Sequence, residues 1–135
     1  MTPREQRVKA TAALFLTVSL FLVRNAHATQ QAAGSCTIVG TPGPDLLFGT
    51  SKRDVICGLG GNDLLDGNSG NDVLKGGPGR DQLNGGDGND VLFGGLGNDT
   101  FFAWDGFADM LNGGPGTDRA FHDKLDRVYA VERGG

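Results

Sequence analysis

The chain has 135 residues, enough for one domain, and it carries a formal net charge of −4. Glycine accounts for 24 residues, well above the roughly 7% of an average protein. An acidic chain has no electrostatic attraction to nucleic acid or to anionic membrane surfaces, so this balance excludes both partners and favours cations.

Residues 1–28 are predicted to be a secretory signal peptide. Arg4, Arg7 and Lys9 make a basic start, residues 10–23 form an apolar run, and residues 26–28 give the A-x-A cleavage pattern AHA. The alternative is an uncleaved membrane anchor, but the apolar run is shorter than the roughly 20 residues that span a bilayer. We therefore expect a secreted, extracellular protein with no membrane insertion after cleavage. The mature chain, residues 29–135, holds 8 Lys and Arg against 15 Asp and Glu, a formal charge of −7.

Residues 29–39 are predicted to cap the repetitive region that follows. They keep its nine-residue spacing, with Ile38 at an apolar position and Cys36 where the repeats carry aspartate. Cys57 ends a repeat two rows later. Both cysteines lie in the exported part, where an oxidising compartment favours a disulfide, and two free buried thiols are the alternative. We expect a Cys36–Cys57 disulfide that staples the first coil.

Residues 40–121 repeat with a period of nine. Rows written from Gly40 read GTPGPDLLF, GTSKRDVIC, GLGGNDLLD, GNSGNDVLK, GGPGRDQLN, GGDGNDVLF and GGLGNDTFF; a ten-residue insertion row, AWDGFADMLN (residues 103–112), and GGPGTDRAF follow. Every row has an aspartate at the same phase: Asp45, Asp54, Asp63, Asp72, Asp81, Asp90, Asp99, Asp109 and Asp118. Two residues later the rows are apolar, with Leu47, Ile56, Leu65, Leu74, Leu83, Leu92, Phe101, Leu111 and Ala120. One apolar residue per row at a fixed phase predicts a stacked core.

These rows resemble the RTX family of hemolysin-type calcium-binding nonapeptide repeats, whose pattern is G-G-x-G-x-D-x-U-x with a large aliphatic residue at U. The resemblance covers residues 40–121, about two thirds of the chain. It implies an all-β fold, a right-handed parallel β-roll of two short-stranded sheets, with calcium ions between the turns of successive coils. The residue columns agree with that fold, although they do not exclude other solenoids.

Glycine and aspartate at these positions suit calcium. Glycine adopts positive φ without steric cost, so a glycine-rich turn can bring carbonyl oxygens together, and the aspartate adds a carboxylate. Calcium takes about six to eight oxygen ligands and tolerates irregular geometry, whereas zinc prefers imidazole and thiolate. The candidate ligands are therefore the nine repeat aspartates and the turns that begin at Gly58, Gly67, Gly76, Gly85, Gly94 and Gly113.

Alternate rows should fall on the same edge of the roll. One edge then carries Asp45, Asp63, Asp81, Asp99 and Asp118, and the other carries Asp54, Asp72, Asp90 and Asp109. Pairing of neighbours allows at most seven calcium sites, four on one edge and three on the other. Lys52 occupies the fourth position of its row, and Ala103 and Trp104 replace the glycines of the insertion row, so sites that use Asp54 or Asp109 should be the weakest. The best sites are expected at residues 58–63, 67–72, 76–81, 85–90 and 94–99.

Calcium is expected to be needed for folding. A thin roll buries one modest side chain per row, whereas ordering costs roughly 1–2 kcal/mol per residue in backbone entropy. We therefore expect the calcium-free chain to be largely disordered, with binding and folding as one event and an affinity of about 0.1–1 mM. The expected function is that of a secreted calcium-binding protein. The alternative is a non-catalytic adhesion or envelope-binding module that uses calcium only as a structural staple.

The remaining features predict a cap and no catalysis. Residues 122–135 lose the glycines but keep Leu125, Val128, Tyr129 and Val131, so we expect them to fold back as a C-terminal capping strand. The chain has no HExxH or G-x-S-x-G motif, and His122 has no nucleophile to serve, so we expect no enzyme. We expect the tail to cover the aromatic residues outside the apolar column, the alternative being a partner surface; they are Phe48, Phe93, Phe102, Trp104, Phe107 and Phe121.

Overall fold

The structure, a computed structural model, describes residues 35–131. Within this range the protein is all-β, with eleven short strands and no helix. The described part accordingly offers no helix long and apolar enough to cross a membrane. The predicted signal peptide, most of the predicted N-terminal cap and residues 132–135 lie outside the described residues.

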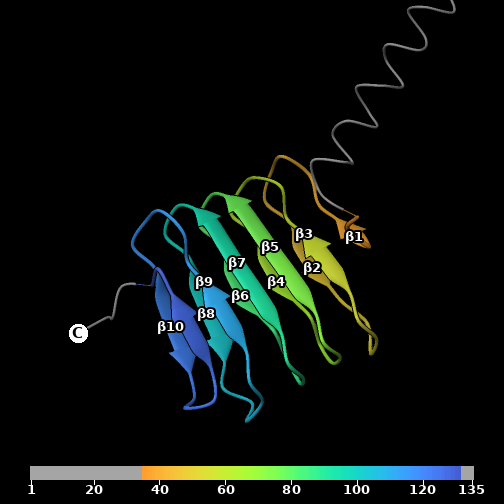
Figure 1. Ribbon diagram of the computed structural model, residues 1–135. Coiled ribbons are helices and arrows are strands. Elements are labelled where there is room, and N and C mark those ends of the chain that lie inside the picture. The colour runs from red at the N-terminus through yellow and green to blue at the C-terminus, as the bar shows by residue number, and fades with distance from the viewer. Residues whose placement is uncertain (1–34, 132–135) are drawn as a thin grey trace, which may run out of the picture. The chain divides into compact units, whose positions relative to one another are not determined.

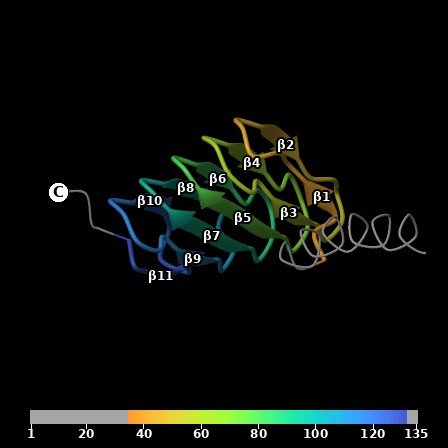
Figure 2. The ribbon, with the colours of Figure 1, turned by 90° about the horizontal axis from the view of Figure 1, so that it is seen from above.

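The strands form two parallel sheets. The first runs in the order β1 (Ile38–Val39), β3 (Val55–Cys57), β5 (Val73–Pro78), β7 (Val91–Leu96), β9 (Met110–Asn112) and β11 (Arg127–Tyr129). The second runs β10 (Arg119–His122), β8 (Thr100–Ala103), β6 (Gln82–Asn84), β4 (Leu64–Asp66) and β2 (Leu46–Phe48). Consecutive strands alternate between the sheets, so two rows make one coil, and about five coils stack into a solenoid (Figures 1 and 2). The predicted β-roll is confirmed.

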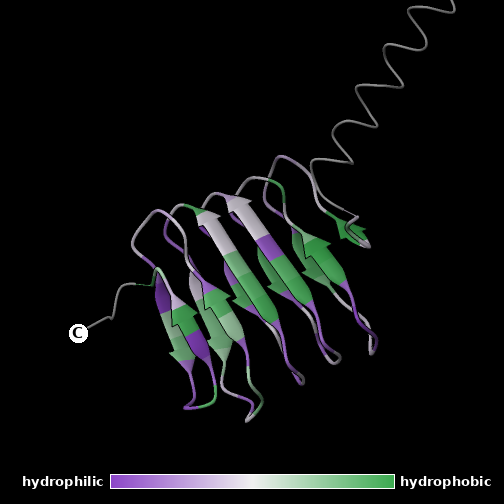
Figure 3. Cartoon of the chain, viewed as in Figure 1, coloured by the Kyte–Doolittle hydropathy of each residue, from purple (hydrophilic) through white to green (hydrophobic). Residues whose placement is uncertain are grey.

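The apolar column forms the core. The register pairs each apolar residue with its equivalent one coil further on, as in Ile56 with Leu74 and Leu74 with Leu92. Seven members have no exposed surface: Ile56, Leu65, Leu74, Leu83, Leu92, Phe101 and Leu111. The strands are mostly hydrophobic and the turns between them mostly hydrophilic, as Figure 3 shows. The predicted stacked core is confirmed.

The repeat aspartates also face the interior. Side chains two residues apart in an extended segment point to the same side, so each aspartate shares the inward face with the apolar residue that follows it. Eight of the nine are at most 7% exposed, and Asp45 in the first coil is half-buried. The interior of the roll is thus an apolar column flanked by carboxylates.

The C-terminal tail continues the roll, and the expectation that it folds back is wrong. β11 pairs in parallel with β9, with Val128 opposite Leu111, so the tail adds one more strand to the first sheet. Nor does the described part of the tail cover the outward aromatic residues. Phe48 remains 54% exposed and Trp104 78%, while the rings of Phe102 and Phe121 stack at a centroid distance of 5.4 Å.

The predicted Cys36–Cys57 disulfide is present and joins the first coil to the second. Its Cα atoms lie 6.0 Å apart, and the adjacent β1 pairs with β3 through Val39 and Cys57. The covalent link therefore lies at the N-terminal end of the first sheet, where an outermost strand of only two residues has few hydrogen bonds of its own.

Candidate metal centre

Two carboxylate ladders run along the roll, one from each column of repeat aspartates. In both ladders the backbone N–H of one aspartate donates to Oδ1 of the aspartate one coil further on, over 2.7–2.9 Å. For example, Asp63 donates to Asp81 and Asp81 donates to Asp99. Each rung therefore uses one carboxylate oxygen to hold the next coil in register and leaves the other oxygen, Oδ2, for a different partner.

The Oδ2 atoms are buried without a hydrogen-bond partner among the described residues. This holds for Asp63, Asp72, Asp81, Asp90, Asp99, Asp109 and Asp118. A buried unpaired carboxylate oxygen is costly, because it has lost its water and gained nothing in return. Seven such atoms in two regular columns indicate that the roll is built around a positively charged partner.

A first-position glycine lets two candidate ligand oxygens pack closely against the backbone of each turn. A methyl group built at Gly76 would overlap Oδ2 of Asp81 and lie 2.7 Å from the carbonyl oxygen of Gly94, which belongs to the next coil. Equivalent positions at Gly58 and Gly94 have the same surroundings. A carboxylate oxygen and a backbone carbonyl thus border one point, and this is the oxygen donor set that calcium prefers. The residues present fit the metal that the repeats imply.

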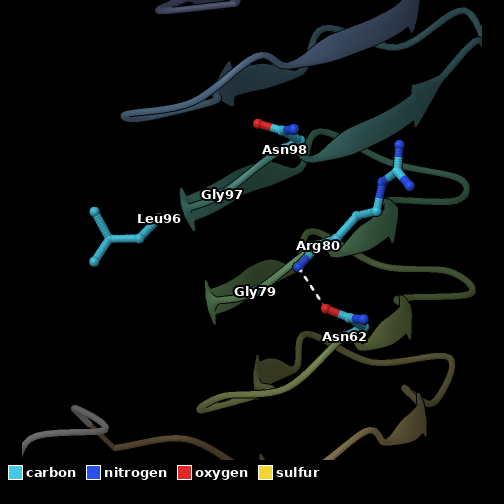
Figure 4. Close-up of a pocket in the computed structure, with 6 residues that line it drawn as sticks. All are labelled: Asn62, Gly79, Arg80, Leu96, Gly97 and Asn98. Atoms are coloured by element: carbon cyan, nitrogen blue, oxygen red, sulfur yellow. Dashed lines mark hydrogen bonds between the residues drawn. The ribbon is translucent and has the colours of Figure 1, made fainter.

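The turns that carry these donors are held in a conformation that favours glycine. Gly77 and Gly79 adopt φ of 106° and 144°, a region that side chains strongly disfavour. The residue before each ladder aspartate ties neighbouring turns together: the N–H of Arg80 donates to Oδ1 of Asn62 over 2.9 Å (Figure 4). The same role falls to Asn71, Asn89 and Asn98. The amide side chains therefore hold neighbouring turns of the folded roll together through hydrogen bonds that need no ion as a ligand.

Burial dominates the electrostatics of the ladders. It raises the pKa of Asp81 to about 6 and that of Asp109 to about 7, and neighbouring carboxylates add to both increases. Burial also raises the pKa of Asp63, Asp72, Asp90 and Asp99. Without a counter-ion, the folded ladders therefore oppose ionisation at neutral pH.

In the first two rungs, a threonine donates hydrogen bonds to the Oδ2 atom. Oδ2 of Asp54 accepts hydrogen bonds from the backbone N–H and the hydroxyl of Thr50, both at 2.7 Å, and Thr41 binds Asp45 in the same way. The N–H of Thr50 is the main cause that lowers the pKa of Asp54. Lys52 keeps a negative φ, so its turn differs from the glycine turns. The N-terminal rungs thus have protein partners where the others have unpaired oxygens.

The C-terminal end contains ladder residues that the sequence reasoning missed. The N–H of Asp109 donates to Oδ1 of Asp126 over 2.9 Å, so Asp126 is the last rung. The signal was available, since Asp126 precedes Val128 by two residues, as in every repeat, after a row shortened by one residue. Asp105 of the insertion row was also missed, and its Oδ2 is buried near Asp109. His122 is exposed, with a ring nitrogen 2.9 Å from the carbonyl oxygen of Asp123.

The fold and the ladders define the class: a repeat-built β-solenoid whose turns present columns of carboxylate and carbonyl oxygens. Residues 39–74 and 66–101 match the family model described as the RTX calcium-binding nonapeptide repeat (4 copies). Residues 39–101 are therefore RTX calcium-binding nonapeptide repeats, and repeats of this kind bind calcium, here with a ladder that offers several sites. A comparison with curated proteins found no match.

Proposed function

We propose that this is a secreted calcium-binding protein in which calcium binding and folding are one event. The observation that carries the proposal is the double column of buried, unpaired Oδ2 atoms. The ligands in this proposal are the aspartates that own those atoms, together with carbonyl oxygens of the turns that begin at Gly58, Gly67, Gly76, Gly85, Gly94 and Gly113. Asp45 and Asp54 contribute less, because Thr41 and Thr50 already bind their Oδ2 atoms.

Coupling between binding and folding follows from what the roll buries. The ladders place ionised groups in an interior that raises their pKa, so the calcium-free fold is disfavoured at neutral pH. The favourable free energy of burial is small, because each row contributes a single core side chain. Against it, each ordered residue costs roughly 1–2 kcal/mol of backbone entropy. A bound divalent ion removes the electrostatic penalty, and its binding free energy becomes folding free energy.

Export is supported by two features of the chain. Residues 1–28 carry the three-part pattern of a secretory signal. The Cys36–Cys57 disulfide fits an oxidising compartment and would not persist in a reducing cytosol. Extracellular calcium then serves as the folding trigger, so that the chain folds after it leaves the cytosol.

Both ends of the roll are assigned caps in this proposal. Residues 29–39 form the N-terminal cap, and residues 122–135, whose strand β11 extends the first sheet, form the C-terminal cap.

A second candidate function is a non-catalytic adhesion or envelope-binding module. The observation in its favour is the exposed aromatic surface on the second sheet, where Phe102 and Phe121 stack and Phe48 is more than half exposed. In that case calcium would hold the scaffold and the aromatic face would contact the partner. Neither candidate uses a catalytic group.

Calorimetric titration of the protein with calcium tests the proposal. We expect several ions to bind per chain, with heat that includes folding, and much weaker binding of magnesium, which demands a more regular octahedral site. A chain that takes up no calcium would overturn the proposal. Mass measurement of protein recovered from the medium tests export: the mass should correspond to residues 29–135 with the disulfide intact.

A further inference from the structure

Asp105 of the insertion row, which the repeat pattern does not explain, forms a cluster with two repeat aspartates, Asp90 and Asp109. Asp90 immediately precedes β7 and Asp109 immediately precedes β9, and these strands are neighbours in the first sheet. Asp105 lies in the turn between β8 and β9. One carboxylate oxygen from each of the three lies within 4.8 Å of the other two.

The oxygens of the cluster point inward and lack protein partners. Oδ2 of Asp90, of Asp105 and of Asp109 is buried with no hydrogen bond to any described residue. Asp90 and Asp109 are 1% and 2% exposed as whole residues, so their ligand atoms are fully withdrawn from water. The charges that act on Asp109 are those of Asp105, Asp90 and Asp126, all of them negative. Three unpaired carboxylates at this separation require a cation to offset their repulsion.

The insertion row explains why a third carboxylate is present. In an ordinary repeat, the space beside the first glycine is bordered by a ladder Oδ2 and by the carbonyl oxygen of the next coil, as at Gly76. At Gly85 the three nearest atoms all belong to Asp90, and the next coil begins with Ala103 in place of glycine. Asp105 therefore brings a charged oxygen to the part of the ladder where the insertion row departs from the glycine turn.

The turn holds Asp105 in a fixed orientation. Its Oδ1 accepts a hydrogen bond from the N–H of Phe107 over 2.8 Å, which leaves Oδ2 for the cluster. The N–H of Gly106 donates to Oδ2 of Asp123 over 2.9 Å, so the tail anchors the same turn. Both contacts orient Asp105 in the folded roll and leave its Oδ2 directed into the cluster.

We propose that Asp90, Asp105 and Asp109 form a three-carboxylate calcium site, which differs from the other ladder sites by its third carboxylate and binds calcium most tightly in this protein. The proposal rests on calcium binding by the repeats. A site with more carboxylate ligands and a more rigid frame has the higher calcium affinity. The row that the sequence pattern marks as the weakest thus holds the strongest site.

Calcium titration of the full chain and of two matched variants tests this assignment. Asp105→Asn removes one ligand charge while its amide oxygen still accepts the Phe107 N–H. Asp66→Asn, the control, removes the same charge from strand β4 of the second sheet, outside the ladders and their turns, and its amide oxygen can still accept the Asn68 N–H. We expect Asp105→Asn to weaken the first calcium-binding step about tenfold or more. The control should bind the first ion with wild-type affinity, and both variants should bind the later ions with wild-type affinity.

A second measurement needs no variant. Terbium(III) prefers the same oxygen ligands, and Trp104, the single tryptophan, adjoins Asp105 in the chain. Luminescence excited through tryptophan should saturate with the first ion bound in the wild type, and in Asp105→Asn it should need a higher terbium concentration and no longer saturate with the first ion. An unchanged first step in Asp105→Asn, or terbium that binds first without this signal, would overturn the assignment. A wild-type chain that binds calcium only in one class of weak sites would also overturn it, whereas a chain that binds no calcium would overturn the proposed function instead.

Discussion

The substitution Gly76→Ala isolates one glycine-turn site. The added methyl group would overlap Oδ2 of Asp81 and lie 2.7 Å from the carbonyl oxygen of Gly94, and both oxygens are assigned as calcium ligands. Gly76 is outside the left-handed region, so alanine is compatible with its backbone φ, and the methyl group acts by displacing these two oxygens. The matched control is Gly43→Ala, whose methyl group would have its nearest contact at 3.8 Å, with the Thr41 hydroxyl.

The size of the effect follows from linkage. At a calcium concentration of about 100 times Kd, one site stabilises the folded state by about 2.7 kcal/mol, because the gain is RT ln(1 + [Ca]/Kd). In a domain of this size, 1 kcal/mol shifts Tm by roughly 4–8 °C. Loss of one site should therefore lower Tm in calcium by about 10–20 °C.

Two measurements test this prediction. Circular dichroism during heating gives Tm, and calorimetric titration gives the number of calcium ions bound per chain. We expect Gly76→Ala to bind at least one ion fewer and to unfold at a lower temperature in calcium, whereas Gly43→Ala should match the wild type. The reasoning is refuted if Gly76→Ala binds as many ions as the control with the same Tm, because the two oxygens beside Gly76 would then not be calcium ligands.

Three further predictions concern pH, the core and the disulfide. With chelator present, acidification from about pH 7 to 4 should increase β-structure by circular dichroism. The raised pKa values of Asp81 and Asp109, about 6 and about 7, mean that the folded state binds protons more tightly, so this stabilisation is lost as pH rises; a flat profile would contradict it. Leu83→Ala should cost about 2–5 kcal/mol in denaturant titrations with calcium, since Leu83 is fully buried, whereas Leu46→Ala at a 60% exposed site should be nearly neutral. Reduction of the Cys36–Cys57 disulfide should cost about 3 kcal/mol in the same assay, and an unchanged midpoint would argue against its stabilising role.

The repeat made most of the fold predictable. A fixed period of nine places one apolar residue and one aspartate per row, and stacking of identical rows leaves little freedom in sheet order or register. The two ladders, the core column and the disulfide follow from that period. Burial of the aspartates follows as well once their two-residue spacing from the core residue is applied, as for Asp72 and Leu74.

The departures from the repeat were harder to predict. The Thr50 hydroxyl donates a hydrogen bond to Oδ2 of Asp54, and this contact depends on the conformation of the turn. A single atypical row does not predict that conformation. Asp126 was hidden by the loss of a single residue, which moves the tail out of the nine-residue frame. The position of the Asp105 carboxylate near Asp90 and Asp109 depends on how the ten-residue row folds against its neighbours. This tertiary contact has no periodic signal in the sequence.

The central claim is that calcium binding by the carboxylate ladders drives folding. Its most direct test is a circular dichroism titration of the oxidised protein at neutral pH with calcium, magnesium and chelator. We expect a largely disordered spectrum in chelator, a cooperative change to β-structure with calcium in the range of about 0.1–1 mM, and little response to magnesium. A fully folded spectrum in chelator, or an equal response to magnesium, would contradict the claim.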